Sequence, residues 1–255
     1  MKKIFYLIVF SLSNIIVAQN GTYKNNMTLN YEMHINLGKL KQYNSTLYIQ
    51  NNRSFFHWND TTNKSATSTD EFGNYKFHLD ITDETGTINY TDFGKGSLLT
   101  RSLRFKEVII LEENNPRIKW DLKEETKKIG SFTCHKAIGE FRGRIYTAWY
   151  TLDVPVNAGP WKLQGLPGLI LEAYDKEKFV QFYFKSIKTS GPQKAFDYSK
   201  IFEEGKRISV QEYAESQKNL ANDLVKKLKS KFPRGVTVSV ESTSENFLER
   251  DFGKQ

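Results

Sequence analysis

Apolar and polar residues alternate along much of the first half of the chain. In residues 27–37 every second residue is apolar, which is the period of a strand that covers a core with one of its faces. Shorter segments of this kind recur about every eight to twelve residues and are separated by turn residues. This rhythm predicts a mostly β protein in which successive strands pair in an antiparallel meander.

The strand pattern is found in many segments, and the stretches between them are predicted to be turns or loops. The predicted strands are residues 27–37, 43–49, 53–58, 75–81, 87–92, 97–104, 106–111, 118–122, 134–141, 145–152, 169–174, 179–187 and 236–240. Residues 59–73, which are rich in Thr, Ser, Asn and Asp, are predicted to form a surface loop. Residues 123–130 are predicted to be a short charged connection. Segment 145–152 has aromatic residues on both faces, which predicts a central strand.

The pattern changes to a helical period near the C-terminus. Ser209 and Glu212 fit a capping box, and apolar residues then recur at helical spacing until Pro233. We therefore expect an amphipathic helix over residues 209–231, a shorter one near Ile201, and a frayed polar end over residues 242–255. The expected fold is mainly β (α+β): a long curved antiparallel sheet or open half-barrel that is covered by the C-terminal amphipathic helix.

The first residues have the order of a secretory signal peptide. Lys2 and Lys3 precede a short apolar stretch that ends in small residues at Ala18. Serine and asparagine interrupt this stretch, and a membrane-spanning helix needs about 20 apolar residues. We expect residues 1–18 to be removed, leaving residues 19–255 as a single β-rich domain with no transmembrane span. Cys134 is the only cysteine, so we expect a periplasmic or secreted protein that is not a lipoprotein and has no disulfide.

The net charge is positive, and acidic residues are interspersed with the basic ones. The formal charge is +8 at pH 7, and loss of Lys2 and Lys3 with the signal leaves +6. A basic protein can bind nucleic acid or an anionic membrane. However, the sequence has no nucleic-acid-binding motif, and an exported protein rarely meets nucleic acid. The sequence therefore predicts no nucleic-acid partner.

One apolar hexamer, Gly-Leu-Pro-Gly-Leu-Ile at residues 165–170, contains two glycines and a proline. We expect Pro167 and Gly168 to form a turn in which proline fixes φ and glycine supplies a positive φ. The hexamer and its flanking residues 130–137, 144–151 and 159–161 resemble the GLPGLI (Porph_ging) family of exported Bacteroidota proteins. The resemblance extends from about residue 118 to about residue 187. It implies an exported protein of the cell envelope and no established chemistry.

Two interpretations of the segment around the hexamer are possible. It is either a rigid loop that clamps one end of a sheet, or a loop that presents apolar side chains to a ligand or a partner, because an ordered Pro/Gly loop has little conformational entropy left to lose. The candidate binding residues under the second reading are Trp149, Pro160, Trp161, Leu163, Gly165, Leu166, Pro167, Gly168 and Leu169.

Cys134 and His135 are weak candidates for catalysis. A thiolate beside an imidazole can attack an ester or amide or bind a soft metal. Neighbouring residues of a strand, however, point to opposite faces, and an isolated cysteine in a β-rich chain usually packs as a small apolar residue. The four histidines show no metal-binding spacing, so we expect no metal and no cofactor.

Three functions remain open. The first is non-catalytic binding of an apolar ligand or an envelope protein partner near the GLPGLI loop, which predicts a continuous apolar cavity. The second is a thiol- or metal-dependent hydrolase that uses Cys134 and a histidine, which predicts a solvent-reachable thiol. The third is a structural partner in an outer-membrane assembly, which predicts an exposed apolar patch.

Overall fold

The computed structural model describes residues 26–37, 40–59, 66–69, 75–78, 83–104, 107–190, 199–229 and 247–252. The predicted signal peptide and the predicted strand at residues 236–240 lie outside these ranges. No helix of the described part is long and apolar enough to cross a membrane.

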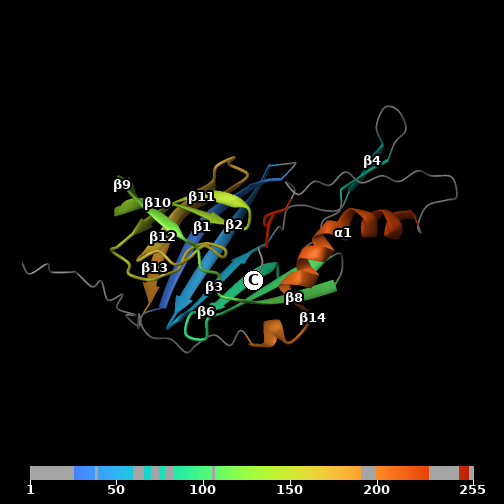
Figure 1. The fold of residues 1–255 in the computed structure, drawn as a ribbon, viewed down its shortest axis with the longest axis horizontal. Coiled ribbons are helices and arrows are strands. Elements are labelled where there is room, and N and C mark those ends of the chain that lie inside the picture. The colour runs from blue at the N-terminus through green and yellow to red at the C-terminus, as the bar shows by residue number, and fades with distance from the viewer. Residues whose placement is uncertain are drawn as a thin grey trace, which may run out of the picture.

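The described part is dominated by strands (Figure 1). They are β1 (Asn26–Asn36), β2 (Leu40–Gln50), β3 (Arg53–Trp58), β4 (Ala66–Thr69), β5 (Tyr75–His78), β6 (Thr87–Asp92), β7 (Ser97–Arg104), β8 (Glu107–Asn114), β9 (Trp120–Ile129), β10 (Phe132–Phe141), β11 (Arg144–Thr151), β12 (Leu169–Asp175), β13 (Val180–Ser190) and β14 (Lys206–Ile208). The helices are the 3₁₀ helix η1 (Ser199–Phe202) and α1 (Val210–Lys229).

Twelve of the described strands form one open sheet in the order β14-β8-β7-β6-β3-β2-β1-β13-β12-β11-β10-β9. The pairs are antiparallel except for the short parallel pair of β14 with β8. Strands β4 and β5 pair separately. The predicted class, a mainly β protein with a long, open, mostly antiparallel sheet, is therefore confirmed.

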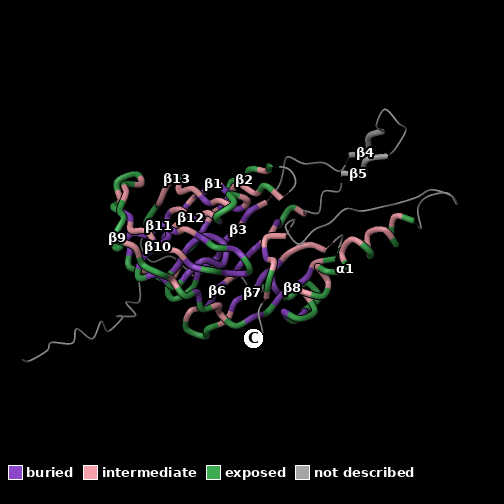
Figure 2. Tube along the Cα trace, turned by 45° about the horizontal axis from the view of Figure 1, so that its top comes forward, coloured by how far each residue is buried: buried purple, intermediate pink, exposed green. Residues whose placement is uncertain are grey.

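The alternating pattern of the first predicted strand fixes which face of the sheet meets the core. Met27, Leu29, Tyr31 and Met33 of β1 are buried, and the residues between them are half-buried. Because side chains alternate along each strand, the neighbouring strands add to the same layer, which Figure 2 shows as the buried centre of the sheet. The β12–β13 hairpin predicted through residues 175–178 is also present.

The two ends of the sheet's strand order come near each other in space. Glu113 on β8 forms an ion pair with Arg142, which follows β10. These strands are the second and the eleventh in the sheet order, so the sheet curls strongly although it does not close by backbone pairing. Residues just before the hexamer contact the end of β8, because Lys162 pairs with Glu113 and Gln164 donates to the side chain of Asn115.

Three expectations about local structure are wrong. Residues 123–129 belong to the edge strand β9 and are not a connection. The predicted loop at residues 59–73 contains strand β4. The predicted frayed end contains residues 247–252, which pack against the sheet, and Glu249 there is buried.

Helix α1 begins over β8 and then runs past the edge of the sheet (Figures 1 and 2). The predicted capping box is present: the Glu212 carboxylate accepts hydrogen bonds from the Ser209 backbone N–H, at 2.7 Å, and from its hydroxyl, at 2.9 Å. Arg104 of β7 ties the helix to the sheet by donating to the carbonyl of Ser216 and to the carboxylate of Asp223. The expected helical cover is therefore confirmed for the first part of α1.

Candidate functional site

The segment between β11 and β12, residues 152–168, folds back onto the sheet and is called the signature segment here. Its two ends are tied together, because the Leu169 N–H donates to the Val154 carbonyl at 3.0 Å and the Ile170 N–H to the Ala158 carbonyl at 3.0 Å. These hydrogen bonds fix the start of β12 against the first half of the signature segment. This arrangement supports the reading of a rigid clamp.

The two glycines of the hexamer are required for different reasons. Gly165 has a positive φ of 90°. Gly168 does not, so the prediction of a positive φ at Gly168 is wrong. A Cβ at Gly168 would instead lie 2.1 Å from the carbonyl oxygen of Thr151, which is closer than any side chain can approach. Glycine is needed at residue 168 for close backbone packing.

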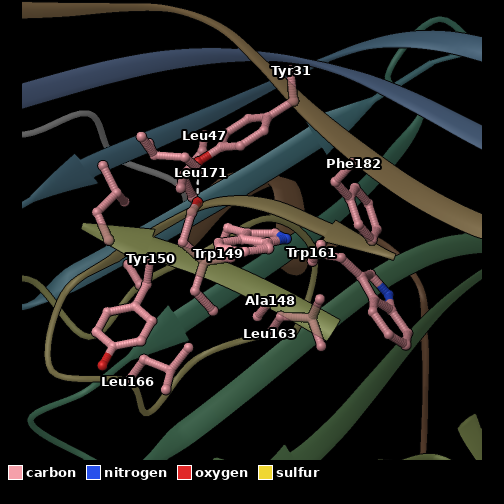
Figure 3. Packing of buried hydrophobic residues seen from close by; sticks show 14 of the residues in the cluster. Tyr31, Leu47, Ala148, Trp149, Tyr150, Trp161, Leu163, Leu166, Leu171 and Phe182 are labelled. Carbon is pink, nitrogen blue, oxygen red and sulfur yellow. Dashed lines mark hydrogen bonds between the residues drawn. The ribbon is translucent and has the colours of Figure 1, made fainter. Parts of the chain in front are cut away.

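Most of the predicted binding residues lie inside the core. Trp149, Pro160, Trp161, Leu163, Leu166, Gly168 and Leu169 are buried, whereas Gly165 and Pro167 are exposed. Figure 3 shows Leu163 and Leu166 packed among Ala148, Tyr150 and their neighbours. Trp161 borders one of the two hollows described below and Gly165 the other, whereas Leu163, Leu166 and Leu169 contribute to core packing.

A buried cluster of four charged residues, here called the ionic cluster, lies beside the signature segment. Lys162 forms ion pairs with Glu113 and, at 2.7 Å, with Glu249. Arg142 pairs with the same two carboxylates. All four side chains are at most 6% exposed. Two cations thus meet two anions, and the cluster is neutral overall.

The charge state of Lys162 follows from these contacts. Burial by itself would lower the pKa of the Lys162 ammonium, but the carboxylates of Glu249 and Glu113 outweigh it and raise the pKa above its ordinary value. Lys162 is therefore held as a cation. It fits a structural ion pair and not a proton-transferring base, which requires a lowered lysine pKa.

A second buried pair fixes the C-terminal segment, residues 247–252. Arg144 and Asp175 pair at 2.7 Å, and both side chains are fully buried. The remaining guanidinium N–H groups of Arg144 donate to the carbonyls of Phe247, at 2.6 Å, and Leu248, at 3.0 Å. The segment is thus held by its backbone and delivers Glu249 into the ionic cluster.

Sequence reasoning missed the ionic cluster. One signal was present: Lys162 stands between Trp161 and Leu163 in an otherwise apolar stretch, and a lysine is almost never fully buried unless it is paired. Its partners could not be identified, because Glu113 and Glu249 are far from it in the sequence.

A cavity of about 290 Å³, here called the helix cavity, lies between the sheet and α1. Its apolar wall includes Trp58, Leu103, Ile109, Trp161, Leu220 and Leu248. The polar residues at its wall are largely engaged in other contacts. The Arg104 guanidinium binds α1, the Thr100 hydroxyl accepts from Asn89, and the Glu249 carboxylate pairs with Lys162.

A larger and more polar cleft of about 1030 Å³, here called the amide cleft, opens at another part of the signature segment. It is lined by Phe93 and Gly96 of the β6–β7 turn, by Asn114 at the end of β8 and residues 115–118 after it, and by Asn157, Gln164 and Gly165. The signature segment therefore contributes Trp161 to one hollow and Gln164 to the other.

The weak catalytic candidates do not form a catalytic pair. Cys134 is fully buried, and burial raises the pKa of its thiol to about 11, so the reactive thiolate is scarce at neutral pH. Cys134 lies opposite Thr151 in the β10–β11 register, whereas His135 lies opposite Tyr150 and contacts its ring. Within the described ranges, no three His, Cys, Asp or Glu residues are grouped as a metal site.

Comparison with known proteins confirms the resemblance to the GLPGLI family. Residues 142–172 match the family model described as "Protein of unknown function (Porph_ging)". This match contains β11, the signature segment and the start of β12, together with Arg142, Arg144 and Lys162. No curated protein matches the chain.

Two solved structures of PNGF-II, in space groups P21 and C2, share the fold. They align with a TM-score of 0.52 at 16% and 18% sequence identity, over 75% of this chain. The aligned part covers only 32% of PNGF-II, so the matching region spans about a third of that protein. The likeness concerns the fold alone.

Proposed function

We propose that this protein is an exported, non-catalytic binding protein of the cell envelope that holds a small apolar ligand in the helix cavity. The single observation that carries the proposal is an apolar hollow bordered by Trp161 of the signature segment, at the place where the sequence predicted apolar recognition. Export rests on the signal-like residues 1–18 and on the family resemblance.

The size and the polarity of the helix cavity both favour an apolar ligand. A volume of about 290 Å³ is at the lower end of known ligand sites, which span roughly 300–1,000 Å³. It suits a single aromatic ring system or a short alkyl chain. The Arg104, Thr100 and Glu249 side chains at the wall are bound to protein groups, so a polar ligand would have to compete for them at a cost in desolvation.

The hydrolase alternative is less well supported. A thiol nucleophile needs access and a lowered pKa, whereas Cys134 is buried and its thiol pKa is raised. The structural-partner alternative needs a contiguous apolar patch. The large apolar residues exposed in the described part are Leu40, Tyr48, Leu122, Ile145 and Leu152, and they are distributed over β2, β9, β11 and the signature segment.

Calorimetric titration with alkanols of six to ten carbons as probes tests the proposal. Leu220→Trp places a larger side chain at the cavity wall and is expected to weaken probe binding about tenfold or more. Leu122→Trp is the matched control, because Leu122 is 54% exposed on β9 and does not line the cavity. It is expected to leave binding unchanged.

Two results would overturn the proposal. One is the absence of saturable binding by the folded protein. The other is equal binding by Leu220→Trp and the unmodified chain, which would place the probe elsewhere. Circular dichroism of each variant establishes that the sheet is intact before binding is compared.

A further inference from the structure

We propose that the amide cleft is a second binding site, for a saccharide that carries a carboxylate. The cleft lies on a different part of the signature segment from the helix cavity, and this proposal does not depend on the ligand of that cavity. It rests on three features: the rigidity of the cleft's walls, the free polar groups on them, and the sign of their charge.

The walls of the cleft are hydrogen-bonded to one another. Gln164 donates to the side chain of Asn115 and, at 3.3 Å, to the carbonyl of Pro116. The Trp120 indole N–H donates to the Gln164 carbonyl at 2.7 Å, and the Asn115 N–H donates to the Gly96 carbonyl at 2.8 Å. The three chain segments around the cleft therefore form one preorganised frame, which lowers the entropic cost of binding.

The frame leaves other polar side chains available. Asn115 and Gln164 are used to hold the walls, whereas the side chains of Asn114, Asn157 and Arg117 are exposed. In the described part of the chain, these three make no side-chain hydrogen bond or ion pair. Each carboxamide offers two donors and one acceptor oxygen, which suits adjacent hydroxyl groups that both donate and accept.

The cleft also has an apolar face and a positive charge. Phe93 is half-buried on its wall, and a ring can pack against the C–H face of a sugar. Arg117 is the charged residue among the described lining residues, and none of these carries a carboxylate. A guanidinium binds a carboxylate with two parallel hydrogen bonds. Carboxamides, a ring and an arginine together fit an acidic sugar better than a neutral or a cationic one.

The volume is consistent with more than one sugar ring. A cleft of about 1030 Å³ reaches the upper part of the range for small-molecule sites, roughly 300–1,000 Å³. A short acidic oligosaccharide is therefore the expected class of ligand. An extended peptide is less suitable, because the cleft presents side-chain amides and not a row of unpaired backbone groups as an open strand edge does.

Calorimetric titration of the full chain with trigalacturonic acid and with its methyl ester tests this inference. The ester keeps all the sugar hydroxyl groups and removes the charges. The acid is expected to bind at least about tenfold more tightly than the ester, and Arg117→Gln is expected to abolish that difference. Asn157→Ala is expected to weaken both ligands, because it removes a carboxamide that both would use.

Lys119→Gln is the matched control, since it removes the same charge from an exposed neighbour that does not line the cleft. It is expected to leave the preference for the acid unchanged. Equal losses in Arg117→Gln and Lys119→Gln would reduce the binding to general attraction by a basic protein and overturn the inference. Absence of binding to both ligands, or equal binding of acid and ester, would overturn it as well.

Discussion

Replacement of Lys162 tests the energetic role of the ionic cluster. Lys162→Met keeps the aliphatic stem but removes the ammonium, so Glu113 and Glu249 are left with Arg142 as their shared cation. The Glu113 side chain has no exposure and Glu249 is 6% exposed, so solvation by water compensates for little of the lost cation. Removing one partner of a buried ion pair typically costs about 3–5 kcal/mol. We expect a loss of that size in the free energy of unfolding.

The assay is equilibrium unfolding in urea at pH 7, followed by tryptophan fluorescence. Lys128→Met is the matched control, because Lys128 is exposed on β9 and its replacement should change the free energy of unfolding by no more than about 0.5 kcal/mol. The double variant Lys162→Met/Glu113→Gln restores charge balance, with Arg142 facing Glu249. It should be more stable than the sum of the single losses predicts, by at least about 1 kcal/mol.

Either of two results would contradict this role of Lys162. A loss below about 1 kcal/mol in Lys162→Met would show that the ammonium is not needed to compensate the buried carboxylates. Strict additivity in the double variant would show that Lys162 and Glu113 do not interact in the folded protein.

Three further measurements follow from the structure. Gly168→Ala should destabilise the protein by about 2 kcal/mol or more in thermal unfolding, because its Cβ would lie 2.1 Å from the Thr151 oxygen. Gly165→Ala is the comparison, with an expected loss of about 1 kcal/mol in the free energy of unfolding because of the positive φ. An equal or smaller loss in Gly168→Ala would contradict the prediction. The Cys134 thiol, with its pKa raised by burial to about 11, should react with a disulfide reagent at pH 8 at least about 100-fold more slowly in the folded than in the urea-unfolded protein; comparable rates would refute its burial. Folding raises the pKa of Lys162. The contribution of Lys162 to the free energy of unfolding should therefore be fully present below the pKa of an unfolded lysine and be lost as pH rises through the folded pKa. The stability difference between the unmodified chain and Lys162→Met should therefore hold from pH 7 to about pH 10 and shrink above it, and a loss already at pH 8 would contradict the raised pKa.

The sequence predicts strands well where turn residues mark their start. The predicted bounds of β3, β6 and β7 coincide with those of the structure, because Asn52, Gly86 and Gly96 immediately precede these strands. Strand β9 is predicted only in its first part, since residues 118–122 are expected to form a strand and residues 123–130 a connection. It is an edge strand in which charged residues are exposed on both faces, so no alternation marks it, and charge on an edge is typical of strands that avoid further pairing.

The candidate sites depend on contacts that no local pattern contains. Residues 242–255 as a whole are polar enough to predict a frayed end, yet Arg144 binds the carbonyls of Phe247 and Leu248. Such a contact is set by the position of the β10–β11 hairpin and not by the composition of the end. The sequence similarly indicates Trp161 as a recognition residue but does not predict that Gln164, three residues later, faces a different hollow.

The position of Lys162 links the closure of the sheet to both hollows. Side chains of the signature segment join the two ends of the sheet. Lys162 contacts Glu113 of β8, and Gln164 contacts Asn115 just after that strand. Trp161 packs on Phe141 of β10. An apolar residue at position 162 would often stabilise as well as a buried ion pair does, so the pair is better explained by orientation. A lysine that must reach two carboxylates fixes the backbone on both sides of it. On either side of Lys162, Trp161 borders the helix cavity and Gln164 borders the amide cleft.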